Sequence, residues 1–253
     1  MPRYRLTLAY DGGDFAGWQV QPGERTVQSV LEAAAATLFG EEIRLHPSGR
    51  TDAGVHARHQ IAVFATETER DDRAVLKALN ALTPSDVAVL AVDRVSDDFD
   101  PRRWARRKRY RYRWQVSAVP DPLRRRELRH LRGPFRVEEA HEALQSLVGT
   151  HDFSSFRAVG CASTHAVRTV TALNLHAVGD EVHLDVEGNG FLRHMVRIIA
   201  GCAEQVGLGR KPVGWVAAVL AAEDRAAAGP TLPAHGLCLE LTEYGDGPPE
   251  WML

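Results

Sequence analysis

The feature that most constrains the fold is a strict alternation of arginine and aromatic residues near the middle of the chain. From Arg109 to Val116 the sequence reads Arg-Tyr-Arg-Tyr-Arg-Trp-Gln-Val. Successive side chains of a β-strand point to opposite faces, so Tyr110, Tyr112 and Trp114 fall on one face and the arginines on the other. The pattern therefore predicts a strand with one aromatic face and one cationic face.

The rest of the chain alternates between strand patterns and helix patterns. Tyr4, Leu6, Leu8 and Tyr10 share one strand face, and Thr26 is placed to cap the following helix. The expected strands are Arg3–Ala9, Ile43–Leu45, Gln60–Phe64, Asp86–Val95, Arg109–Val116, Val167–Ala177, Glu181–Val186 and Leu237–Leu241. The expected helices are 26–39, Asp71–Leu82, Val137–Val148, Phe191–Val206 and Pro212–Ala222, with turns at Gly149–Phe153 and Val178–Asp180. Because several strands are joined by short turns, we expect an α/β (α+β) fold with a mixed or antiparallel sheet.

Composition limits the class of protein. The 253 residues are 44% hydrophobic and 25% charged, as in ordinary globular domains. No apolar run approaches the length that spans a bilayer, and the first residues lack a signal core, so we expect a cytoplasmic protein with no membrane partner. Cys161, Cys202 and Cys238 are scattered, which predicts neither a disulfide framework nor a metal site.

Charge is segregated along the chain although the net charge is only −2. Arginines and one lysine dominate residues 102–113, and five more arginines lie between Arg124 and Arg132. Local basic density in a nearly neutral protein is typical of a groove that binds a polyanion. Arginines that decorate solvated faces would give the same pattern, and charge alone does not choose between these interpretations.

The stretch Gly49-Arg50-Thr51-Asp52-Ala53-Gly54-Val55-His56 carries the candidate chemistry. Gly49 and Gly54 are expected to let the backbone turn tightly, and Arg50 can orient a bound group. An acid such as Asp52, on a glycine-flanked loop at a strand edge, is well placed to act as a nucleophile. The alternative is an Asx-type turn capped by its own side chain.

Two further elements could join Asp52 and Arg50 in one site. Tyr110 lies at the junction of the basic segment and its strand, although this strand alone favours a plain sheet aromatic. In the helix expected from Phe191, Arg193 and Arg197 are spaced one turn apart and are expected to share a face, while the opposite side is apolar. A solvated helix face is the alternative for this pair.

An ordered set of motifs resembles the tRNA pseudouridine synthase A family. Each piece is a weak signal, whereas the set in this order covers nearly the whole chain and is specific. The motifs are Tyr10-Asp11-Gly12, Phe15-Ala16-Gly17-Trp18-Gln19, Thr26-Val27-Gln28, Gly49 through His56, Arg109 through Tyr112, Asp152-Phe153-Ser154-Ser155-Phe156-Arg157, Gly190 through Arg197 and Pro233-Ala234-His235-Gly236-Leu237.

The resemblance implies a fold and a reaction. Members of the family isomerise uridine to pseudouridine at positions 38, 39 and 40, in the anticodon stem-loop of tRNA, as homodimers with no cofactor or metal. Their pseudouridine synthase fold has two α/β domains that share a central mixed, mostly antiparallel sheet flanked by helices. We accordingly expect an N-terminal domain over residues 1–105, a C-terminal domain over residues 106–253 and an active-site cleft between them.

The resemblance also implies roles for single residues. Asp52 matches the family's catalytic aspartate, Tyr110 its active-site tyrosine and Arg197 an arginine that pairs with the aspartate. Arg50 matches an arginine implicated in displacing the target base, and Leu237 an apolar residue beside the uracil. Three more arginines are expected to contact the RNA: Arg102, Arg109 and Arg193.

The chain departs from the family pattern at two places. Phe99-Asp100-Pro101-Arg102 stands where many relatives have Phe-His-Ala-Arg, and Cys238 stands where an aromatic residue is common. Neither change touches Asp52. The residues leave open whether Asp52 attacks C1′, attacks C6 or takes a proton from C2′, and a tRNA-binding module without catalysis and an N-glycosylase remain the alternative functions.

Overall fold

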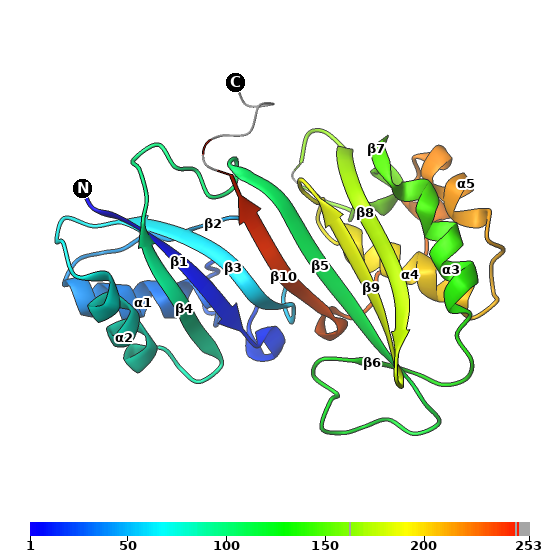
Figure 1. Cartoon of the computed structure of the whole chain (residues 1–253), viewed down its shortest axis with the longest axis horizontal. Coiled ribbons are helices and arrows are strands. Elements are labelled where there is room, and N and C mark those ends of the chain that lie inside the picture. Colours follow the sequence, from blue (N-terminus) through cyan, green and yellow to red (C-terminus); the bar gives the residue numbers. More distant parts are fainter. Residues whose placement is uncertain (162, 246, 248–253) are drawn as a thin grey trace. The chain divides into compact units, whose positions relative to one another are not determined.

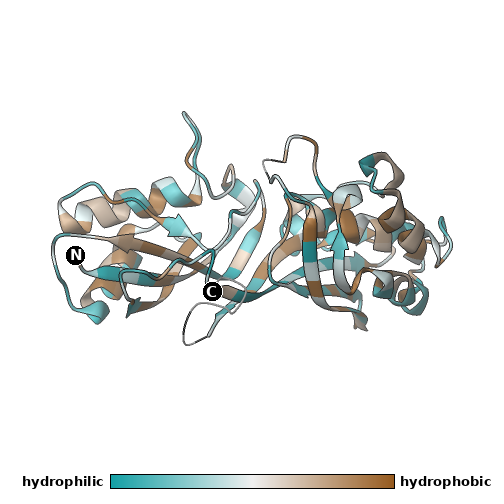
Figure 2. Cartoon of the chain, turned by 90° about the horizontal axis from the view of Figure 1, so that it is seen from above, coloured by the Kyte–Doolittle hydropathy of each residue, from teal (hydrophilic) through white to brown (hydrophobic). Residues whose placement is uncertain are grey.

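The computed structural model describes residues 1–161, 163–245 and 247 as two compact units. The first unit contains Met1–Arg106 together with the chain after Cys238, and the second contains Arg107–Cys238. The expected α/β (α+β) fold, with mostly antiparallel strands flanked by helices, is confirmed. Figure 2 shows that apolar residues run along the strands of both units.

The first unit is an antiparallel sheet covered on one face by two helices (Figure 1). Its strands lie in the order β4-β1-β3-β10, with β2 paired to β3. The elements are β1 (Arg3–Tyr10), α1 (Val27–Phe39), β2 (His46–Pro47), β3 (His56–Ala65), α2 (Asp72–Leu82), β4 (Val87–Arg94) and, from Leu239, most of β10 (Leu237–Tyr244), with a 3-10 turn at Gly12–Asp14.

Local signals account for most of this unit. Tyr4, Leu6 and Leu8 of β1 are fully buried, as their alternation predicts. The Thr26 side chain accepts a hydrogen bond from the Ser29 backbone N–H and forms a capping box at the start of α1, which confirms the predicted cap. The prediction of a strand at Ile43–Leu45 is wrong, because the next two residues, His46 and Pro47, pair with β3 instead.

The second unit is a sheet in the order β5-β9-β8-β7, packed against helices. Its elements are β5 (Ala105–Val116, from Arg107 onward), β6 (Arg129–Leu131), α3 (Val137–Leu144), β7 (Gly149–Asp152), β8 (Val167–Val178), β9 (Glu181–Gly188), α4 (Met195–Gly207) and α5 (Trp215–Ala222). The β5–β6 pair is parallel, whereas β5–β9, β7–β8 and β8–β9 are antiparallel, so the sheet is mixed.

The alternation in β5 and the hairpin between β8 and β9 are confirmed. Tyr112 and Trp114 are fully buried, and Gly179 takes φ +61° in the hairpin turn. The turn expected at Gly149–Phe153 is instead the strand β7, which pairs with the start of β8. A short polar segment carries no hydrophobic period, so this pairing was invisible in the sequence.

Candidate active site

Asp52 lies in a loop of the first unit, between β2 and β3, and is half-buried. The Val55 backbone N–H donates to the Asp52 carbonyl oxygen at 3.1 Å, which closes a turn. Gly54 has φ +78° at the third position of this turn, where a glycine is favoured. The turn is therefore closed by a main-chain hydrogen bond.

Gly49 lies at a bend in the chain before Asp52. Its φ is not positive, so its conformation in the loop is one that other residues also adopt. Its carbonyl oxygen instead accepts a hydrogen bond from the buried Gln60 amide of β3 at 2.8 Å. The side-chain amide oxygen of Gln60, Oε1, accepts a hydrogen bond from the Ser48 hydroxyl at 2.7 Å. One β3 side chain therefore supports the loop where it begins.

The segment after β1 holds the loop from another direction. The Trp18 backbone N–H donates to the Thr51 carbonyl oxygen at 3.0 Å, and the Gly54 N–H donates to the Phe15 carbonyl oxygen at 3.2 Å. A side chain on Gly12 would place its Cβ 2.0 Å from the Val55 carbonyl oxygen. Main chain therefore packs directly against main chain, which fixes the loop more firmly than flexible side chains would.

Gly17 is expected to be intolerant of alanine for two separate reasons. Its φ is +92°, and a Cβ would lie 2.9 Å from the Thr51 carbonyl oxygen. Left-handed backbone costs an alanine about 1–2 kcal/mol, and overpacking adds about 1–3 kcal/mol. Gly17→Ala should thus lower the free energy of unfolding in urea by about 2–5 kcal/mol.

Gly23→Ala is the matched control for this prediction. Gly23 has φ +75°, but a Cβ there would meet nothing within 4 Å. Gly23→Ala should therefore lower the free energy of unfolding only by the cost of left-handed backbone for an alanine, about 1–2 kcal/mol. Equal losses in the two variants would contradict the close packing of Gly17 on the Asp52 loop.

Tyr110 belongs to β5 in the second unit and pairs with Val186 of β9. Its ring meets the Phe191 ring edge-on, with centroids 5.3 Å apart and an interplanar angle of 87°. Tyr110 is half-buried, unlike Tyr112 and Trp114 on the same strand face. The ring is held by an aromatic neighbour and keeps part of its surface exposed.

The helix expected from Phe191 begins later, at Met195. His194 takes left-handed backbone, with φ +63°, and a residue in that conformation cannot continue a right-handed helix. Arg193 therefore lies outside α4 and is exposed, and its carbonyl oxygen accepts from the Ala158 N–H at 3.1 Å. The prediction that Arg193 and Arg197 share a helix face is wrong.

Arg197 lies in the first turn of α4 and is tied to the segment that precedes Leu237. Its Nε donates to the Leu232 carbonyl oxygen at 2.7 Å, and the Leu232 N–H donates to the Arg197 carbonyl oxygen at 3.2 Å. Leu237 itself is 5% exposed. The second unit thus links Arg197 and Leu237 through residues 232–237.

Residues 232–237 also contact the strand β5, through Tyr112. The Tyr112 hydroxyl donates to the Pro233 carbonyl oxygen at 3.0 Å, and burial raises the pKa of Tyr112 above its usual range. A Cβ on Gly236 would lie 2.6 Å from Tyr112 Cζ, so only glycine lets the chain cross this ring. Leu237 therefore follows a closely fitted stretch of backbone.

A buried ion pair joins β6 to α4. Glu204 is 3% exposed; its carboxylate accepts two hydrogen bonds from Arg129, at 2.5 and 2.9 Å, and one from the Trp114 indole N–H at 3.0 Å. Hydrogen bonding to Glu204 raises the pKa of Arg129. The Glu204 carboxylate therefore ties α4 to both β5 and β6.

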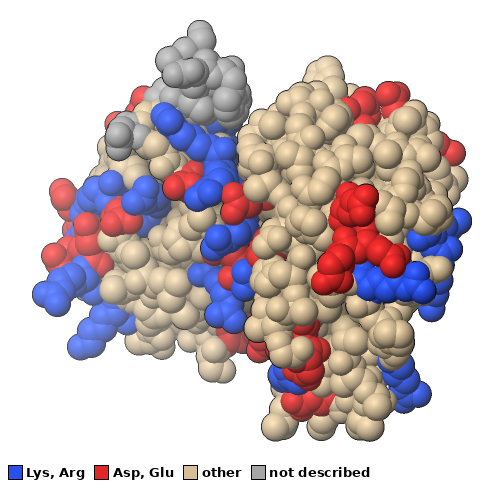
Figure 3. Space-filling model, turned by 45° about the vertical axis from the view of Figure 1, so that its right-hand side comes forward, with Lys and Arg blue, Asp and Glu red and all other residues tan. Residues whose placement is uncertain are grey.

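Many arginines of the two basic clusters are engaged in ion pairs inside the second unit. On the face that Figure 3 shows, basic side chains lie among acidic ones. The pairs are Arg107–Glu187 (3.0 Å), Arg109–Glu187 (3.8 Å), Arg111–Asp185 (2.9 Å), Arg113–Glu127 (2.8 Å) and Arg124 with Asp121, Asp180 and Glu181 (2.5–2.9 Å). The basic runs of the sequence thus overstate the positive charge available to a polyanion. Arg50 and Arg102 of the first unit are exposed.

Comparison with known proteins identifies the family. A family model described as tRNA pseudouridine synthase matches residues 7–102 and 143–245. The chain belongs to the tRNA pseudouridine synthase family. The resemblance expected from the motifs is confirmed, and the family is one of enzymes.

Curated relatives are similar to this chain over nearly their full length. The tRNA pseudouridine synthase A of Myxococcus xanthus is 48% identical over 250 residues, which cover 98% of this chain and 94% of that protein. The protein of the same name from Geotalea uraniireducens is 44% identical, with 96% and 100% covered. That of Halalkalibacterium halodurans is 46% identical, with 94% and 90% covered.

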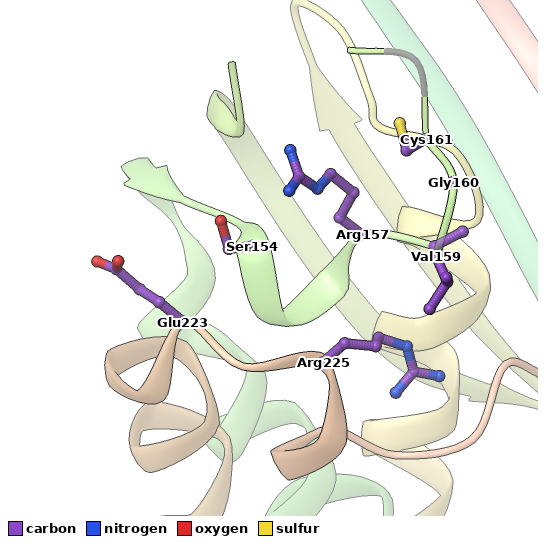
Figure 4. Close-up of a pocket in the computed structure, with 8 residues that line it drawn as sticks. Ser154, Arg157, Val159, Gly160, Cys161, Glu223 and Arg225 are labelled. Atoms are coloured by element: carbon purple, nitrogen blue, oxygen red, sulfur yellow. The ribbon is translucent and has the colours of Figure 1, made fainter. Parts of the chain in front are cut away.

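A pocket of about 380 Å³ in the second unit of this synthase contains none of the expected site residues (Figure 4). It is lined by Ser154, Arg157, Ala158, Val159, Gly160, Cys161, Glu223 and Arg225. The motif that begins at Asp152 borders this pocket and makes hydrogen bonds within the second unit. The Ser154 hydrogen bonds lower the pKa of Asp152, and the Ser155 hydroxyl donates to the Val219 carbonyl oxygen at 2.6 Å.

The described part of the chain has neither a metal-holding cluster nor a membrane-spanning helix. Among residues 1–161, 163–245 and 247, no group of three or more His, Cys, Asp or Glu side chains is arranged to hold a metal ion. Within the same ranges, no helix has both the length and the apolar character needed to cross a membrane.

Sequence reasoning missed the residues that support the Asp52 loop. Gln60 reads as part of a buried strand, and Gly12 and Gly17 read as ordinary loop glycines. Two signals were available: a glutamine at the start of an apolar run, and a tyrosine at the end of a buried strand face. Neither signal identifies the residue to which the side chain bonds, because these hydrogen bonds join residues 11 to 41 positions apart.

Proposed function

We propose that this synthase isomerises uridine to pseudouridine in tRNA, with Asp52 as the nucleophile or general base. Similarity over 98% of the chain to a tRNA pseudouridine synthase A supports the reaction. The observation that carries the assignment to Asp52 is its half-buried position on a loop that is held by main-chain hydrogen bonds to Trp18 and Phe15 and by the Gln60 side chain. A carboxylate fixed in this way is preorganised for attack.

The reaction rearranges one nucleotide without an added group. The C1′–N1 glycosidic bond breaks, the freed uracil turns, C5 bonds to C1′, and the C5 proton is lost to solvent while N1 gains one. Asp52 would attack C1′, attack C6 or remove the C2′ proton, and each of these needs an ionised carboxylate. The C5 proton must leave in every case.

Tyr110, Arg197 and Leu237 are proposed to act on the same uridine as Asp52. The half-buried Tyr110 ring, held edge-on by Phe191, is suited to stack on the uracil. Arg197 would pair with the Asp52 carboxylate and favour its charged form. Leu237 would exclude water, which would otherwise hydrolyse the intermediate to free uracil.

The RNA-binding part of the proposal rests on arginines. Arg50 would help to displace the target base from its stack, at a cost of a few kcal/mol. Arg102, Arg109 and Arg193 would contact phosphates of the anticodon stem-loop. The target uridines are proposed to be those at positions 38, 39 and 40, the enzyme a cytoplasmic homodimer, and the reaction independent of a cofactor.

The proposed function predicts tritium release from tRNA labelled at uracil C5. Purified protein should release tritium in step with the appearance of pseudouridine at positions 38–40, mapped on the recovered tRNA. Chromatography of the products separates the alternatives. Free uracil would identify an N-glycosylase, and tRNA binding without tritium release would identify a binding module; either result would overturn the proposal.

A further inference from the structure

A buried hydroxyl pair lies directly beside Asp52 in the first unit. Tyr10, the last residue of β1, is 5% exposed, and its hydroxyl oxygen is 2.8 Å from the Thr51 hydroxyl oxygen. Thr51 is 7% exposed. The Gln60 amide Nε2 also approaches the Tyr10 oxygen, at 3.4 Å. This pair belongs to none of the steps assigned above.

The orientation of the Gln60 side chain makes its NH₂ group the donor to Gly49 and Tyr10. Its side-chain amide oxygen, Oε1, accepts a hydrogen bond from the Ile61 backbone N–H at 3.1 Å, so the NH₂ group of the same amide is directed to Gly49 and Tyr10. The Tyr10 oxygen thus accepts from Gln60 and shares a hydrogen bond with the Thr51 hydroxyl, in which either oxygen can be the donor. Tyr10 therefore connects the β3 side chain to the residue that precedes Asp52.

Thr51 is held at two of its polar atoms. Its hydroxyl contacts Tyr10, and its carbonyl oxygen accepts from the Trp18 N–H at 3.0 Å. A threonine side chain is stiff about χ1, so fixing its hydroxyl also fixes its Cα–Cβ direction. Holding both atoms restricts the position of the backbone that carries the Asp52 side chain.

We propose that Tyr10 is a positioning residue for Asp52 and acts through the Thr51 hydroxyl. The inference rests on the proposed function of Asp52 as the reacting carboxylate. Loss of the Tyr10 hydroxyl would let the peptide between residues 51 and 52 shift and would move the carboxylate. Displacements of about 1 Å cost catalysis as much as about 100-fold.

The first test compares the kinetics of single variants. Tyr10→Phe and Thr51→Val should each lower kcat by about 10- to 100-fold, with KM for tRNA changed by less than about threefold. Thr51→Ser restores a hydroxyl at the same position and should recover most of the activity. An unchanged kcat in Tyr10→Phe would overturn the proposal.

Tyr4→Phe is the matched control. Tyr4 is a fully buried tyrosine of the same strand face, and its hydroxyl donates to the Arg70 carbonyl oxygen at 2.8 Å, away from the Asp52 loop. It should lose stability as Tyr10→Phe does while keeping kcat. A matching fall of kcat in Tyr4→Phe would show that the effect of Tyr10 is general destabilisation and would overturn the proposal.

A double-mutant cycle tests whether Tyr10 acts through Thr51. In the Thr51→Val background, Tyr10→Phe should change kcat by less than about twofold, because the shared hydrogen bond is already absent. Fully additive losses would overturn the proposed route. Asp52→Asn separates the two proposals: full activity in that variant would refute the proposed function, whereas an inactive Asp52→Asn beside a fully active Tyr10→Phe refutes only the positioning role.

Discussion

Asp52→Asn should abolish pseudouridine formation while leaving the fold and tRNA binding intact. Asparagine has nearly the same shape but cannot act as a nucleophile or a base, so kcat should fall by about 10⁴-fold or more. The β-turn is closed by the Asp52 backbone and the loop is held by Trp18 and Phe15, none of which depends on the carboxylate. Tritium release from C5-labelled tRNA measures the reaction, and urea unfolding measures stability.

Asp71→Asn is the control for the chemical change itself. The Asp71 side chain caps α2 by accepting from the Ala74 N–H at 3.0 Å, and asparagine caps helices about as well. Its activity should equal that of the unaltered protein. If Asp52→Asn kept activity within about tenfold, a different residue would have to carry the chemistry.

Glu204→Ala is expected to cause the largest loss of stability. It would leave Arg129 charged and partly buried without its carboxylate, and the Trp114 indole N–H without its acceptor. Removing one partner of a buried ion pair costs about 3–5 kcal/mol. Urea or thermal unfolding followed by circular dichroism would measure this loss.

Glu139→Ala is the matched control for Glu204. Glu139 pairs with Arg136 at 3.3 Å, and both side chains are about half exposed (47% and 60%). Exposed pairs contribute about 0–1 kcal/mol, so this variant should be close to the unaltered protein. A Glu204→Ala loss no larger than that of Glu139→Ala would contradict the structural role given to the buried pair.

Elements that follow from local patterns were predicted well. The strand face of Tyr4, Leu6 and Leu8, the Thr26 cap and the hairpin at Gly179 each depend on residues close in sequence. The same holds for the alternation in β5, although its arginines are paired with Glu187, Asp185 and Glu127. Sequence identifies the cationic face but not the acids that neutralise it, because these lie on other elements.

The errors occurred where a distant contact overrides local preference. Residues 191–194 carry a helical pattern, yet His194 adopts left-handed backbone and α4 starts at Met195. The Ala158 N–H bonds to the Arg193 carbonyl oxygen, a contact across 35 positions that helix propensity does not include. Arg193 and Arg197 are separated for this reason.

The sequence by itself determined the strand and helix periods, the family and the candidate carboxylate Asp52, since each depends on residue types at fixed local spacing. Only the tertiary structure decided how the Asp52 loop is held. Gly12 and Gly17 admit main chain at distances that a Cβ would block, and Gln60 and Tyr10 reach Gly49 and Thr51 from other strands. Such close approaches arise when distant segments pack together, and they leave no period in the sequence.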